Sequence, residues 1–165
     1  MSTQTQQERL QKWRNGIKIA HNSHLRAAAY YTQRGRMLGV PVVILTTIIG
    51  TAVFTSIAAN SQGSIALQVT AGLLSMAAAA LSSLYTFLNY GGLAERHRTA
   101  AVKYGNLRRE VEQLLCFMNN KNDLEATMEN IRTRWDSVDF EAPEIPQKIH
   151  DKVRRQLSKN PEEEK

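Results

Sequence analysis

Polar side chains recur at helical spacing in the most apolar part of this chain. Every seventh position from 68 to 89 carries a hydroxyl or an amide: Gln68, Ser75, Ser82 and Asn89. Residues seven apart lie on one face of a helix. Such groups need hydrogen-bond partners in a bilayer, either on other helices or in water. This face is therefore a candidate pore lining or helix-packing surface.

An earlier apolar stretch carries Thr47, Thr51 and Thr55, with Gly50 beside them. Small residues allow helices to approach closely in lipid, so these threonines extend the candidate pore and helix-packing face. The alternative interpretation is that Ser and Thr hydroxyls bond the carbonyl groups of their own helix, and that the small faces only join two spans. The residues themselves leave both interpretations open.

Residue patterns that support catalysis or metal binding are sparse. The sequence has no G-x-G-x-x-G, Walker, G-x-S-x-G, H-E-x-x-H or C-x-x-C motif. His21 and His24 have a spacing that can bind a metal, but no acidic or cysteine ligand lies nearby in sequence. Cys116 is the single cysteine and is interpreted as a packed small residue. We expect no enzymatic activity, no cofactor and no metal site.

Charge is distributed very unevenly along the 165 residues. Residues 1–37 carry seven Lys or Arg against one acid, and residues 95–165 carry 14 of each sign. The 57 residues from 38 to 94 carry no Asp, Glu, Lys or Arg. A soluble chain of this size has too little other material to cover such a block, so the pattern predicts insertion in a bilayer.

The charge-free block divides into two predicted membrane spans. Residues 40–59 form a stretch of about 30 Å as a helix, with Pro41 in its first turn. A polar turn at 60–64 precedes a second span at 65–90, and Gly91-Gly92 is expected to loosen its exit. Basic residues flank both spans and the turn has no charge. The positive-inside rule therefore predicts a multi-pass protein of the cell (inner or plasma) membrane with both termini in the cytoplasm.

Two apolar stripes with alternating three- and four-residue spacing flank the spans. The first stripe includes Trp13, Ile17, His24 and Tyr31, and the second includes His97, Tyr104, Val111 and Leu114. Their equal lengths predict that both spans continue into the cytoplasm and pair there as an antiparallel coiled coil. That register places Tyr31 beside His97, Ile17 beside Val111 and Leu10 beside Met118. Alternatively, each arm lies on anionic lipid with its basic residues facing the headgroups.

The predicted fold is all-α, a two-transmembrane hairpin whose spans extend into a cytoplasmic antiparallel helical bundle. We expect one domain over residues 1–165. Its expected parts are an N-terminal helix at 1–37, spans at 40–59 and 65–90, a cytoplasmic helix at 93–121, and C-terminal helices with an acidic tail at 123–165. Pro143 and Pro146 are expected to interrupt this last region.

Four short strings resemble the SLATT family over roughly residues 15–155. They are HLRAAAYY at 24–31, LGVP at 38–41, AERHR at 94–98 and APEIP at 142–146. The family comprises bacterial two-transmembrane effector domains with a cytoplasmic helical region, associated with nucleotide-synthesising and nucleotide-sensing partners. The resemblance implies a pore-forming effector that arrests or kills the host cell in conflict, including antiviral, systems. Its trigger is expected from a partner protein or a diffusible nucleotide.

Two functional hypotheses follow. The first is a homo-oligomeric, pore-forming membrane effector, of which a holin-like lesion former is a variant with another trigger. The second is a non-conducting adaptor that recruits partners through its cytoplasmic helices. Nucleic acid is not an expected partner, because the basic excess borders the membrane block and no nucleic-acid-reading motif is present.

Overall fold

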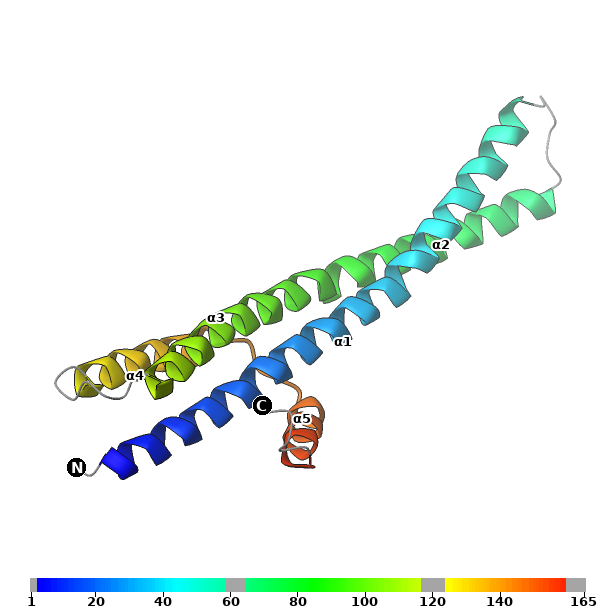
Figure 1. The fold of residues 1–165 in the computed structure, drawn as a ribbon. Helices are drawn as coiled ribbons and strands as arrows, with labels where there is room; N and C mark the ends of the chain where they lie inside the picture. The colour runs from blue at the N-terminus through cyan, green and yellow to red at the C-terminus, as the bar shows by residue number, and fades with distance from the viewer. Residues whose placement is uncertain (1–2, 59–64, 117–123, 160–165) are drawn as a thin grey trace. The chain divides into compact units, whose positions relative to one another are not determined.

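The computed structural model describes residues 3–58, 65–116 and 124–159. Within these ranges it contains five helices and no strand (Figure 1). The helices are α1 (Thr3–Ala58), α2 (Ile65–Leu88), α3 (Tyr90–Cys116), α4 (Leu124–Glu141) and α5 (Gln147–Lys159). The all-α prediction is confirmed. The predicted turns at 60–64 and 119–123, and the acidic end of the chain, lie outside the described residues.

Helix α1 joins the N-terminal arm and the first predicted span into one helix of 56 residues. Pro41 lies inside this helix, whereas the sequence predicted that it would lie in the first turn of a separate span. Proline removes one intrahelical hydrogen bond. The helix nevertheless continues, because every other backbone group of an apolar stretch in lipid must still find an intrahelical partner.

The second span ends earlier than predicted, at Leu88, and α3 begins at Tyr90 rather than at residue 93. Asn89, between them, has a φ of 40°, a conformation that Asn tolerates better than most residues. Its backbone N–H donates to the Tyr85 carbonyl at 3.3 Å, and its side-chain oxygen accepts the Gly92 N–H at 3.2 Å. Asn89 thus ends α2 and caps α3. The expected loosening at Gly91-Gly92 is wrong, because both glycines lie inside α3.

The chain divides into two compact units. We call residues 1–30 and 93–165 the polar unit, and residues 31–92 the membrane unit. The core of the polar unit draws on α1, α3 and α4, and its buried members are Leu10, Ile17, Ala100, Tyr104, Leu107, Val111, Leu124, Met128 and Ile131. Burial of these apolar side chains is the main stabilising contribution to this unit.

Within the polar unit, the polar contacts give the helix directions. Arg14 of α1 pairs with Glu112 of α3, and His21 of α1 contacts the carbonyl of Ala101, so these two helices are antiparallel. Helix α4 also runs antiparallel to α3. Its Arg134 pairs with Glu110, and its later Glu141 pairs with the earlier Lys103. These ion pairs are partly exposed, so they select an orientation more than they stabilise it.

The membrane unit contains two helical stretches that are long and apolar enough to cross a bilayer. They meet where Tyr31 stacks on Tyr90, with ring centroids 6.0 Å apart. Gly39 allows a further close approach, because a Cβ there would lie 3.3 Å from the ring of Tyr85. By contrast, no described atom outside its own helix lies within 4 Å of a Cβ built at Gly50 or Gly72. Most of the apolar surface of the spans is therefore exposed in a single chain.

Candidate functional site

The threonines of the first span face outward and bond their own helix. Thr47 donates to the Val43 carbonyl at 2.8 Å, Thr51 to the Thr47 carbonyl at 2.8 Å, and Thr55 to the Thr51 carbonyl at 3.0 Å. All three side chains are exposed. Their hydroxyls are therefore satisfied without a second helix, as the back-bonding interpretation expects. The same residues leave a polar edge on the outside of α1.

The predicted face of α2 is also exposed at Gln68, Ser75 and Ser82. Ser75 donates to the Ala71 carbonyl at 2.8 Å, one turn earlier in its own helix. Asn89, the fourth member, lies between α2 and α3, where its side chain caps α3. The described face of α2 thus presents an amide and two serines. The other exposed hydroxyl residues of α2, Thr70, Ser83 and Thr86, bond carbonyl groups of their own helix in the same way as Ser75.

A second cluster of chemical groups lies inside the polar unit. His24 of α1 and His97 of α3 are 2% and 1% exposed, and their Nδ1 atoms are 2.9 Å apart. One ring must donate its Nδ1–H and the other must accept, so Nδ1 carries a proton in one of the two histidines and none in the other. Two imidazolium rings would place two N–H groups against each other. This geometry is therefore incompatible with a second charge on the pair.

Tyr104 connects the histidine pair to α4. Its ring stacks on His24 with centroids 5.2 Å apart, and its hydroxyl donates to the Asp139 carboxylate. Trp135 donates its Nε1–H to the same carboxylate oxygen at 3.1 Å. Burial raises the pKa of Tyr104, and the hydrogen bond and charge of Asp139 raise it further. The hydroxyl therefore remains a donor at physiological pH and helps attach α4 to α3.

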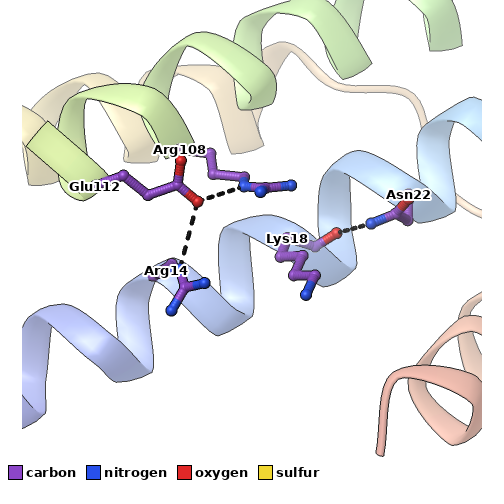
Figure 2. A network of polar contacts seen from close by, with 5 residues as sticks. All are labelled: Arg14, Lys18, Asn22, Arg108 and Glu112. Carbon is purple, nitrogen blue, oxygen red and sulfur yellow. Dashed lines mark hydrogen bonds and ion pairs between the residues drawn. The ribbon is translucent and has the colours of Figure 1, made fainter. Parts of the chain in front are cut away.

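The carboxylate of Glu112 lies between two arginines and links α1 to α3 at a second position, away from the histidine pair. Figure 2 shows Arg14 and Arg108 converging on Glu112, whose Oε1 lies 3.3 Å and 2.8 Å from their respective Nε atoms. Burial alone would raise the pKa of Glu112, but Arg108 and then Arg14 lower it below its ordinary value. Glu112 therefore stays ionised near neutral pH and fixes the register of the two helices.

The seam predicted from the apolar stripes divides between the two units. Ile17 and Val111 are fully buried in one core, while Trp13 and Leu114 pack partly buried against it. Tyr31 was expected beside His97, but it belongs to the membrane unit, where it stacks on Tyr90. His97 instead contacts His24, with which it forms a tilted ring pair. The other predicted partner pair involves Met118, which lies outside the described residues.

The histidine pair predicts a pH-dependent stability of the polar unit. Burial lowers the pKa of His24 from 6.5 to about 4, the nearby His97 and His21 contribute in the same direction, and burial also lowers the pKa of His97. Between about pH 6.5 and 4, these histidines therefore bind protons in the unfolded chain that they do not bind in the folded unit. We expect the free energy of unfolding to fall by about 2 kcal/mol from pH 7 to 5 through His24 alone.

Intrinsic tryptophan fluorescence measures this effect in detergent, because Trp13 and Trp135 both belong to the polar unit. His24→Asn should flatten the pH dependence between pH 7 and 5, whereas His150→Gln on α5 should leave it unchanged. An equally steep dependence in His24→Asn would contradict the assignment. The carboxylates Glu112 and Glu141 have lowered pKa values and act below this window.

Several residues of these contacts were not expected from sequence. Asp139 and Glu112 lie on helices whose relative register the apolar stripes do not determine. His21, considered as a metal ligand, places its Nδ1 2.7 Å from the Ala101 carbonyl and must donate to it. Cys116, expected to be packed, is exposed because it is the last residue of α3. Among the described residues, no group of three or more His, Cys, Asp or Glu could hold a metal ion.

Comparison with known proteins adds one match. The family model of the SMODS and SLOG-associating 2TM effector domain family 4 matches residues 7–160. The match spans both units described above and nearly the whole chain. No curated protein and no solved structure matches the chain.

Proposed function

Because the chain belongs to the SLATT family of SMODS and SLOG-associating 2TM effector domains, we propose that its copies assemble in the membrane and open a pore in response to a partner or a nucleotide signal. Family membership implies a membrane effector in conflict systems. Assembly, conduction and the trigger are the additional steps of the proposal. The trigger would come from a nucleotide-sensing or nucleotide-synthesising partner, and the response would need no turnover chemistry.

The observation that supports a pore is the exposed polar face of α2. Gln68, Ser75 and Ser82 lie on one side of a membrane-capable helix whose surface is exposed in the single chain. Polar side chains remain less favourable than apolar ones against hydrocarbon even where a hydroxyl bonds its own helix, as Ser75 does, so contact with other copies or with water would stabilise this face. Association of several hairpins through this face would enclose the amide and hydroxyl groups and exclude lipid from them. With no charged residue in the spans, such a pore would have no ring of fixed charge to select ions.

We further propose that both ends of the chain lie on the cytoplasmic side of the inner or plasma membrane. Arginines flank the spans on both sides, and the connecting segment has no charge. A cysteine replacing Gln62, in a Cys116→Ser background, should react with an impermeant thiol reagent added outside intact cells. Cysteines replacing Ser2 and Glu164 should react only after permeabilisation. Labelling at the ends but not at residue 62 would invert the topology.

Reconstitution of the full chain in liposomes tests conduction directly. We expect ion flux and collapse of an imposed membrane potential, either at high protein density or after addition of the native partner or a nucleotide extract from activated cells. Native mass measurement in lipid should show more than one copy in the conducting sample. Assembled protein that carries no flux under any of these conditions would favour the adaptor, in which the polar unit recruits partners and the spans only anchor it.

A further inference from the structure

Helix α5 carries a continuous basic stripe on its solvent side. Lys148, Lys152, Arg155 and Lys159 are spaced by four, three and four residues, so they follow one face of the helix. All four side chains are exposed, as is the neighbouring Arg154. Asp151 is the one acidic residue of α5, which leaves the helix with a net charge of +4.

The apolar face of α5 is used for packing, which keeps the basic stripe outward. Val153 is 1% exposed, and Ile149 and Leu157 are half-buried. These three residues lie four apart and share a different face from the lysines. The helix is therefore held in the polar unit by one side and presents its cations on the other.

Elsewhere in the polar unit, many basic side chains already have acidic partners. Lys103 pairs with Glu141, Arg134 with Glu110, and Arg14 with Glu112. Among the described residues, no ion pair involves any of the five basic side chains of α5, and Asp151 contacts His150 instead. The stripe is thus a concentrated positive surface with no anion bound to it within the described chain.

The path of α4 returns toward the start of α3, and α5 follows α4 in the sequence. Along α4, Arg134 pairs with Glu110 and the later Glu141 pairs with Lys103, so α4 runs toward the residues of α3 that follow the second span most closely in sequence. Helix α5 (orange to red in Figure 1) begins six residues after Glu141. The basic stripe therefore follows, along the chain, the end of α4 whose Glu141 pairs with Lys103 of α3.

We propose that this stripe binds the anionic lipid headgroups of the bilayer that holds the two spans. Four cations on one helix face complement an anionic leaflet, and each Lys or Arg near such a surface shifts the docking equilibrium by about fivefold. The spans hold the chain at the bilayer, so lipid is the polyanion at the highest local concentration. This inference concerns the polar unit and does not depend on pore formation.

The test uses the full chain in liposomes, with a fluorophore attached to a thiol introduced by Gln156→Cys in a Cys116→Ser background. Nitroxide-labelled lipid headgroups quench the fluorophore when α5 docks. We expect stronger quenching in phosphatidylglycerol–phosphatidylcholine vesicles than in phosphatidylcholine alone, and a decrease as salt is raised. Replacing the four stripe residues (K148Q/K152Q/R155Q/K159Q) should remove the anionic-lipid increment, with the docking ratio falling by about fivefold for each cation.

A matched control removes four exposed cations elsewhere, R9Q/K12Q/R98Q/R132Q, with the same change in net charge. It should retain the increment, as should K148R/K152R/K159R. Replacing Glu162, Glu163 and Glu164, which follow α5 in the sequence, by Gln should strengthen docking. Equal quenching in both vesicle types, or equal losses in the stripe and control variants, would overturn the proposal. So would stripe-dependent binding of labelled RNA without any lipid-dependent quenching, which would identify a nucleic-acid surface instead.

Discussion

Leucine at both Ser75 and Ser82 is expected to abolish conduction while leaving the protein in the membrane. Both residues are exposed on one face of α2, so two isobutyl side chains would fill or mispack the proposed water path. Leucine is favourable in a span, and the Ser75 hydroxyl bonds only a carbonyl of its own helix among the contacts shown. Insertion should therefore persist while flux falls by at least about tenfold.

The measurement compares liposome flux, membrane potential in cells and growth arrest for this variant and a matched control. Ala77→Leu with Ala80→Leu adds the same two side chains to exposed positions on the opposite side of α2, and it should keep flux within about twofold. Leu74→Ala should also have little effect. If S75L/S82L inserts normally and remains as toxic as the parent, the polar face does not line the path.

Aspartate at Val111 is expected to unfold the polar unit. Val111 is fully buried in the core shared by α1, α3 and α4, where a carboxylate would be removed from water among apolar side chains, and the nearby Arg14 and Arg108 already pair with Glu112. Leaving a charge unpaired there costs about 3–5 kcal/mol, a large fraction of the stability of a small unit. Tryptophan fluorescence should show the transition, because both tryptophans of the chain are in this unit.

Val102 provides the matched control for that change, since it lies on the same helix and is 58% exposed. Val102→Asp should leave the unfolding transition within about 0.5 kcal/mol of the parent. We also expect V111D to retain membrane insertion, because the spans carry their own apolar surface. A V111D variant that unfolds at the same denaturant concentration as V102D would contradict the assigned core.

Composition and periodicity were sufficient for the all-α class and for the two spans. Transfer of a largely apolar run of 57 residues without charge from water into a bilayer is favourable irrespective of the rest of the chain. Its location in a bilayer therefore depends on local sequence alone. The stripe through Ile17, and that through Val111, likewise identified buried faces, because a period near 3.6 is set by the helix itself. The family resemblance rested on short strings and agrees with the family match.

Relations between helices required the tertiary structure. A stripe repeating every seven residues permits neighbouring registers, and only the packed structure shows His97 on His24 and Tyr31 on Tyr90. The break at Asn89 also depended on context, since its positive φ and its cap on Gly92 are stabilised by contacts at both helix ends. Asp139 could be matched to Tyr104 only after α4 packed on α3. Hydrophobic periodicity indicates which face of a helix is buried, whereas side-chain shape and hydrogen bonding determine which residues of the neighbouring helix pack against that face.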